Sequence, residues 1–222
     1  MNKFILFIFL NLSFLIITSA AEQGFRLGVP FTDNMVLQRN VEIPIWGQDS
    51  SGNKISVEFA GQIKTAVADE NGDWMLKLDP LKASLKERSM FIINDKKKSI
   101  KLKRVLIGEV WFSSGQSNMV WIADKSMCNG LAKEIGSSKE ELPIREININ
   151  TVSALYPQQN GTSDGGWKKS SLASGFSALS LSFAYHLYKE LKVPIGILLS
   201  AHSNTRIEAF TQRRAIVEHP KL

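Results

Sequence analysis

The stretch VLIGEVWFSSGQSNM, residues 105–119, joins a nearly continuous apolar run to a short polar segment. Residues 105–112 are apolar apart from Gly108 and Glu109, which is typical of a strand buried on both faces of a parallel sheet. The next residues are rich in Ser, Gly and Asn, which form turns and helix caps. The stretch therefore predicts a buried strand that turns into a helix near Ser117.

The sequence after this stretch alternates between strand and helix patterns. Residues 144–149 and 195–200 are apolar enough to predict two further strands. Between them, apolar residues recur every three or four positions and predict one helix, ended by Val193-Pro194; they are Phe176, Leu179, Phe183, Leu187 and Leu191. A capping-box pattern from Thr205 to Glu208 predicts another helix. This order predicts an α/β domain with a parallel sheet, with polar loops at 125–141 and 158–174 as candidate walls of a site.

The sequence before residue 105 has the patterns of β-structure. Apolar and polar residues alternate over 41–46 and 55–59, and again in the Lys-rich segment that ends at Arg104. Residues 74–78 and 90–94 predict two further strands. Asn71-Gly72 is a residue pair that tight hairpins prefer. Since no helix-period pattern interrupts this region, residues 22–104 predict a small all-β sandwich, followed by the α/β domain at 105–222.

The first 21 residues are of a different kind. Lys3 precedes an almost unbroken apolar run over residues 4–17, and Thr18 to Ala21 are small residues suited to cleavage. This pattern predicts a secretory signal peptide, because the run is short against the roughly 20 residues of a membrane-spanning helix. We expect cleavage after Ala20 or Ala21, a secreted or periplasmic product, and no membrane association afterwards. The single cysteine, Cys128, excludes an intramolecular disulfide.

Composition and charge exclude several classes of partner. The chain is 44% hydrophobic and 22% charged with a net charge of +6, which is ordinary for a globular protein. The basic cluster at 96–104 alternates with apolar residues, as on the solvent-facing side of a strand. We therefore expect no nucleic-acid partner. No group of His, Cys and carboxylates has the spacing of metal ligands, and we expect neither a metal site nor a cofactor.

Ser117 is the residue best placed for chemistry. Ligand sites in open α/β sheets lie at the carboxyl ends of the strands, and unpaired backbone N–H groups at a helix start can stabilise an oxyanion. The residues alone favour an ordinary turn or cap over a nucleophile, because the sequence shows no partner base for the serine.

Several ordered blocks resemble the sialate O-acetylesterase family, within the SGNH hydrolases. Gly108 to Trp111 followed by Gly115 to Met119 resembles its nucleophile block. The other matching blocks are Phe31 to Arg39, Pro44 to Gly47, Asp69 to Trp74, Phe176 to Ala178, Val193 to Gly196, and the residues Thr205, Ile207, Glu208, Ala209 and Phe210.

The resemblance implies the N-terminal part of a flavodoxin-like SGNH hydrolase domain, and hydrolysis of O-acetyl esters on sialic acid or other carbohydrates. Ser117 would be the nucleophile, and Gln116, Asn118, Ser203 and Asn204 would contribute to the oxyanion or substrate site. Ser203 and Asn204 stand where the family has paired glycines. The family's Gln-Gly-Glu and Asp-x-x-His blocks do not occur in this sequence. We therefore expect a chain that is truncated within its catalytic domain and impaired in activity.

Two other functions remain open at this point. The chain could be a non-catalytic carbohydrate-binding remnant that uses the sandwich and exposed aromatic residues, or an SGNH esterase acting on lipids or thioesters. Among the histidines, His202 could lie near Ser117, although a polar loop residue is the simpler interpretation, and we expect His186 at the surface. We expect Trp111 in the core, whereas Trp121 could be exposed or buried.

Overall fold

The computed structural model describes residues 24–152 and 160–218. The predicted signal peptide and His219 lie outside the described residues. Within the described ranges, no helix is long and apolar enough to span a membrane. The fold is a mixed α/β arrangement that combines an antiparallel sheet with a mixed sheet containing parallel strands.

From residue 24 to residue 115, the described chain forms eight strands in two packed layers. They are β1 (Arg26–Leu27), β2 (Val36–Gln38), β3 (Ile43–Gln48), β4 (Lys54–Phe59), β5 (Gln62–Val67), β6 (Asp73–Leu78), β7 (Ser84–Asn94) and β8 (Ser99–Gly115). Strands β1, β3 and β6 form a small antiparallel sheet, and β5, β4, β7 and β8 lie side by side in the large one. The alternating apolar residues of both layers, such as Ile45, Leu78, Val57 and Ile92, are fully buried in a shared core.

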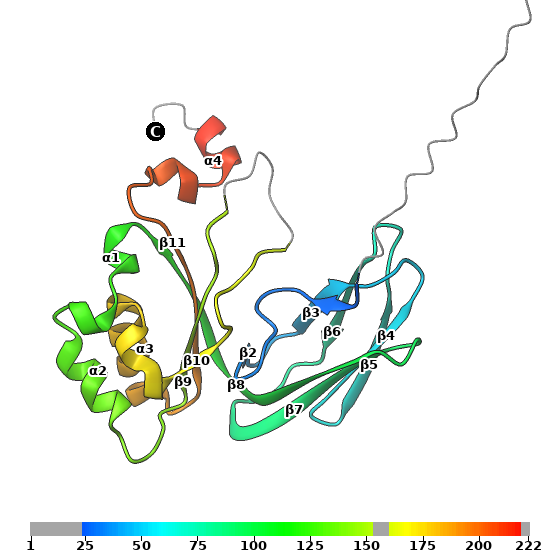
Figure 1. The fold of residues 1–222 in the computed structure, drawn as a ribbon, viewed down its shortest axis with the longest axis horizontal. Helices are drawn as coiled ribbons and strands as arrows, with labels where there is room; N and C mark the ends of the chain where they lie inside the picture. The colour runs from blue at the N-terminus through cyan, green and yellow to red at the C-terminus, as the bar shows by residue number, and fades with distance from the viewer. Residues whose placement is uncertain (1–23, 153–159, 219–222) are drawn as a thin grey trace, which may run out of the picture.

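The second part adds three strands and a helical layer (Figure 1). Strands β9 (Ile144–Asn148) and β11 (Ile195–Ala201) run parallel to β8 in the order β9-β11-β8, and β10 (Lys168–Lys169) pairs with β9 antiparallel. Helices α1 (Ser117–Val120), α2 (Asn129–Gly136) and α3 (Ala178–Leu191) lie on one face of these strands, and α4 (Arg213–Glu218) lies near the end of the chain. Three 3-10 turns are also present, at Ala123–Lys125, Ser170–Gly175 and Ile207–Phe210.

Strand β8 belongs to both parts of the molecule. Its first half pairs antiparallel with β7, residues 106–108 pair parallel with β2, and residues 109–115 pair parallel with β11. Arg104 lies within the strand with a φ of 55°, next to a register shift of the β7–β8 ladder, so the predicted division between residues 104 and 105 falls within β8, beside this irregular residue. The strand that ends at Ser117 is therefore anchored in the β-rich layers.

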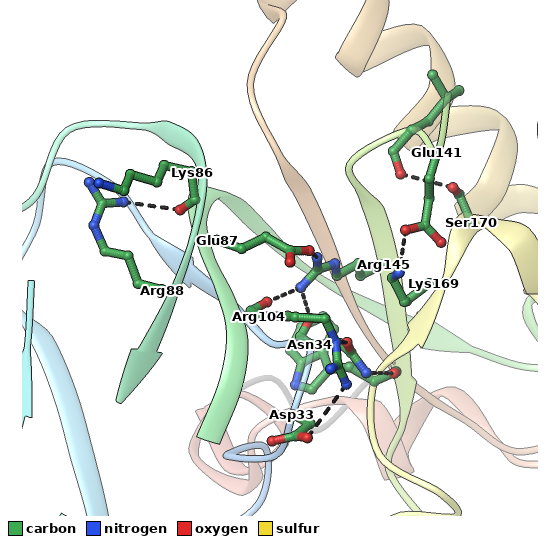
Figure 2. A network of polar contacts seen from close by, with 12 residues as sticks. Asp33, Asn34, Lys86, Glu87, Arg88, Arg104, Glu141, Arg145, Lys169 and Ser170 are labelled. Atoms are coloured by element: carbon green, nitrogen blue, oxygen red, sulfur yellow. Dashed lines mark hydrogen bonds and ion pairs between the residues drawn. The ribbon is translucent and has the colours of Figure 1, made fainter. Parts of the chain in front are cut away.

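A buried arginine links the two parts (Figure 2). Arg145 of β9 is 3% exposed, and its guanidinium donates to the carbonyl of Asn34 at 2.6 Å, to the carbonyl of Arg104, and to Glu87 at 2.8 Å. Burial lowers the pKa of Arg145, and the neighbouring carboxylate of Glu87 opposes that shift. Nearby, Nε1 of Trp167 donates to the carbonyl of Pro30 at 2.7 Å. These contacts hold β9 against the loop before β2.

Most predicted elements of the α/β part are present, with two corrections. The predicted strands are confirmed at 144–148 and 195–201, and the predicted helix at 178–191. Lys192 ends that helix with a φ of 55°. The predicted loop at 125–141 contains helix α2. The predicted helix near Thr205 is wrong: the segment is a 3-10 turn that begins after Arg206 without a side-chain cap, and the Thr205 hydroxyl contacts Ser203 instead.

The predicted hairpin at Asn71-Gly72 also differs from the structure. The turn exists, with Gly72 at a φ of 78°, and Asp69 Oδ1 accepts the N–H groups of Asn71 and Asp73. However, the flanking strands β5 and β6 belong to different sheets. The turn therefore carries the chain from one layer to the other and does not join two paired strands.

Candidate active site

Ser117 lies where β8 ends at the carboxyl edge of the parallel strands. The last pair of the β8–β11 ladder is Gly115 with Ala201, and Gly115 turns the chain with a φ of 143°. Gln116 is the extended residue before α1, and half-buried Ser117 is its first residue. The predicted strand–turn–helix placement of Ser117 is confirmed.

The serine borders an open hollow of about 330 Å³. The hollow is lined by Ser114 to Met119 and by Leu179 of α3. In the described part of the chain, the backbone N–H groups of Ser117 and Asn118 have no hydrogen-bond acceptor. They are the donors that a developing oxyanion would need. A helix dipole adds little here, because α1 is a single turn of four residues.

The loop after β11 lies against the Ser117 turn. The N–H of His202 donates to the carbonyl of Gly115 at 3.0 Å, and the Gln116 side chain donates to the carbonyl of Thr205. Asn204 has a φ of 59°, a conformation that Asn tolerates better than most residues. The fold thus brings the loop containing Ser203 and Asn204 to the segment containing Gln116, Ser117 and Asn118. The Gln116 amide is engaged in holding that loop.

A second layer of contacts supports the turn from beneath. The hydroxyls of Ser177 and Ser180 contact Met119 Sδ at 3.7 and 3.6 Å. The N–H of Ala178 donates to the carbonyl of Trp121 at 2.8 Å, so the segment after α1 is tied to the start of α3. Ser177 is also the N-cap of α3, since its side chain accepts from the N–H of Ser180.

A buried carboxyl group anchors this second layer. Glu146 of β9 is 2% exposed, and both its oxygens lie 3.2 Å from the N–H of Ser177. Burial raises the pKa of Glu146 to about 7, while the Ser177 N–H and then Lys168 oppose the shift. Glu146 was not among the residues predicted for the site. The available signal was a charged pair, Arg145-Glu146, inside a predicted buried strand.

Two of the blocks that resemble the family meet at the base of the serine-bearing strand. Gln38 Oε1 accepts the N–H of Val110 at 2.7 Å, and Arg39 Nε lies 2.5 Å from Glu109 Oε1. Gly108 has no room for a side chain, because an added Cβ would stand 1.9 Å from the carbonyl oxygen of Pro194. These contacts give a physical reason for the pairing of the Phe31–Arg39 and Gly108–Trp111 blocks.

The histidines and tryptophans near the site have separate outcomes. His202 is exposed, and no hydrogen bond joins Ser117 Oγ to a histidine among the described residues. His186 is exposed on α3, as expected. The prediction that Trp111 is in the core is wrong: it is 44% exposed and packs edge-on against Phe183. Trp121 is 62% exposed.

The comparisons with known proteins agree with the resemblance. No family model matches the chain. The sialate O-acetylesterases of Homo sapiens and Mus musculus are each 27% identical to it, over 87% and 90% of the chain. The chain is a distant homologue of the sialate O-acetylesterases. It spans 40% of the length of these curated relatives.

This sialate O-acetylesterase homologue also has a close structural match. The crystal structure of a carbohydrate acetylesterase from Xanthomonas citri is 27% identical, with a TM-score of 0.78 over 89% of this chain and 45% of that one. Homology and fold therefore point to the same family of ester hydrolases. The predicted resemblance is confirmed.

Proposed function

We propose that this chain carries the nucleophile of a serine carbohydrate esterase of the SGNH class, which removes O-acetyl groups from sialic acid or another acetylated sugar. The observation that carries the proposal is the placement of Ser117. The serine follows the end of β8, borders an open hollow, and is accompanied by two backbone N–H groups that have no acceptor among the described residues. The homology to carbohydrate acetylesterases supports the choice of substrate class.

In the proposed reaction, Ser117 Oγ forms a bond to the acetyl carbonyl carbon and gives up its proton to a base. The carbonyl oxygen becomes an oxyanion, which the N–H groups of Ser117 and Asn118 stabilise. Collapse breaks the bond to the sugar oxygen, which leaves with a proton as the free hydroxyl. Water then hydrolyses the acetyl-serine to acetate and restores the Ser117 hydroxyl.

In the proposed reaction, solvent takes the proton of Ser117, because the described residues supply no base for it. Among the described residues, no histidine lines the hollow at Ser117, and loss of a triad member typically costs about four to six powers of ten in rate. We therefore propose that the chain reacts slowly by itself and that added imidazole accelerates it. Gln116 acts by holding the loop of Ser203 and Asn204, whose backbone borders the acyl group.

The test is acetate release from 4-nitrophenyl acetate and from O-acetylated sialic acid, with and without imidazole. We expect imidazole-dependent turnover that Ser117→Ala removes. Ser114→Ala is the matched control, since Ser114 lines the same hollow from β8, and it retains turnover within a few-fold. Equal turnover by the wild type and Ser117→Ala would contradict the proposal.

We also propose that residues 1–21 direct export and that residues 22–104 and 105–222 form a sandwich domain and a hydrolase domain. The pattern of residues 3–21 supports export to the periplasm or medium. N-terminal sequencing of the protein recovered outside the cytoplasm tests this, and a retained Met1 would contradict it.

A further inference from the structure

A second hollow lies on the β-rich part, over the outer face of β3 and β6. Figure 1 shows these two strands away from α1. Its volume is about 460 Å³, within the roughly 300–1,000 Å³ of ligand pockets. It is larger than the hollow at Ser117 and shares no residue with it. Its wall combines Pro44, Trp46 and Met75 with Asp69, Asp73 and Asn160.

The apolar side of this hollow follows from strand alternation. Ile43, Ile45 and Leu76 point into the core, so Pro44, Trp46 and Met75 occupy the opposite face. Trp46 and Met75 are directly opposite each other in the β3–β6 ladder, and Met75 is 59% exposed. Together they form an apolar platform on an otherwise solvated face.

The Trp46 ring is held in place. It packs edge-on against Phe31 with ring centroids 4.4 Å apart. Gly28 lies against the pyrrole nitrogen of the indole: a Cβ added at Gly28 would stand 2.2 Å from Trp46 Nε1. A fixed aromatic surface loses little conformational entropy when a ligand stacks on it.

The polar side of the hollow presents two oriented carboxylates. Asp69 Oδ1 accepts the N–H groups of Asn71 and Asp73, and Asp73 Oδ1 accepts from Gln48 Nε2 at 2.7 Å. In the described ranges, the second oxygen of each carboxylate makes no hydrogen bond to protein. Two anchored acceptors therefore stand beside the aromatic platform.

The charge of this wall is negative. No lysine or arginine lines the hollow among the described residues. Of the basic groups on the same strands, Lys77 pairs with Glu42 at 2.8 Å and Arg26 contacts Gln48. A ligand carboxylate would meet like charge here, whereas ligand hydroxyl groups would find acceptors.

We propose that this hollow binds a neutral saccharide. The C–H face of a sugar ring stacks on Trp46 and Met75, and its hydroxyl groups donate to Asp69 and Asp73. The site would hold a neutral glycan on the β-rich part, independently of the chemistry at Ser117. An acidic sugar such as sialic acid is disfavoured by the two carboxylates.

The test titrates the full chain with neutral hexasaccharides (cello-, xylo- and mannohexaose) and with sialyllactose, followed by calorimetry and by backbone amide NMR. We expect at least one neutral hexasaccharide to bind, with shifts concentrated on β3 and β6, and sialyllactose to bind at least about tenfold more weakly. Trp46→Ala should weaken binding by about tenfold, the loss of one aromatic contact.

Controls separate this site from the active site. Ser117→Ala and Trp121→Ala, the latter an exposed tryptophan elsewhere, should leave binding unchanged, and Trp46→Ala should leave turnover of 4-nitrophenyl acetate unchanged. Met75→Ala at an exposed position and Asp73→Asn at a half-buried one should weaken binding if Trp46→Ala does not fold. No binding by any neutral hexasaccharide, equal binding of sialyllactose, or shifts confined to the Ser117 hollow would each overturn the proposal.

Discussion

The two halves of β8 lie in very different surroundings. In its antiparallel half the core-facing residues Leu102 and Val105 are 6% and 0% exposed, beneath the small sheet. In its parallel half, Trp111 and Phe112 are 44% and 65% exposed, and among the described residues this half pairs along its ladder only with β11. The first half is enclosed by other strands, whereas the second presents the serine and leaves apolar surface accessible. Stability and chemistry are thus separated along one strand.

Buried polar groups show the same contrast. In the β-rich part, Asp49 Oδ2 accepts from Asn94 at 2.7 Å and its other oxygen accepts the N–H of Ser50. In the parallel part, the N–H of Ser177 is the one hydrogen-bond donor to Glu146 among the described residues. A buried carboxyl group with few donors is costly to ionise. The stability of the layer beneath Ser117 therefore depends on pH.

The largest expected change in stability comes from removing the link between the two parts. Arg145→Leu leaves the carbonyls of Asn34 and Arg104 without their buried donor, and we expect a loss of about 3 kcal/mol in unfolding free energy. Urea denaturation measures this loss. The exposed Arg214→Leu should change stability by less than about 0.5 kcal/mol; a similar loss in both variants would contradict the role assigned to Arg145.

The next effect concerns Glu146. Its pKa of about 7 in the fold exceeds the ordinary value of 4.5, so the folded state binds the proton more tightly than the unfolded state. The contribution of the Glu146 carboxyl to the free energy of unfolding is then fully present below pH 4.5. It is lost as the pH rises through 7, and the loss is about 3 kcal/mol.

Glu146→Gln should remove this component of the pH dependence, because glutamine stays neutral. Denaturant midpoints of the wild type and the variant, measured from pH 5 to pH 8, provide the test. The difference between them should grow with pH in favour of the variant. Parallel curves would show that Glu146 does not titrate in this range.

The smallest effect is expected at two asparagines with positive φ. Asn40 in the β-rich part has a φ of 62°, and Asn204 beside the active site has a φ of 59°. Glycine fits this conformation, and its gain is offset by greater freedom in the unfolded chain. Asn40→Gly and Asn204→Gly should therefore each change stability by less than about 0.5 kcal/mol. Only Asn204→Gly should alter acetate release, and an equal effect of Asn40→Gly would contradict the placement of the loop.

Local patterns predicted the elements but not their long-range pairing. Alternation located β3, β4 and β6, and the Val193-Pro194 pair located the end of α3. The crossing from β5 to β6 between sheets, and the pairing of β2 with β8, depend on contacts distant in sequence. Trp111 belongs to a strand pattern typical of burial, and its exposure depends on how few elements cover that half of β8.

At the site, the sequence located Ser117 on its turn, because strand, glycine and polar turn residues are adjacent. Hydrogen bonds link Glu146 to Ser177 and Ser177 to Met119, and these three residues are far apart in the sequence. The charged pair Arg145-Glu146 within a predicted strand indicated an anomaly there, without indicating the partner of Glu146.

The most direct test of the account identifies the residue that becomes acetylated. The chain is incubated with 4-nitrophenyl acetate and imidazole, digested, and analysed by mass spectrometry before and after hydroxylamine, which removes acetyl esters and leaves acetyl-lysine intact. We predict a hydroxylamine-sensitive acetyl group on Ser117, absent from Ser117→Ala. An ester on Ser113 or Ser114 instead, or no ester on any serine, would contradict the assignment of Ser117 as the nucleophile.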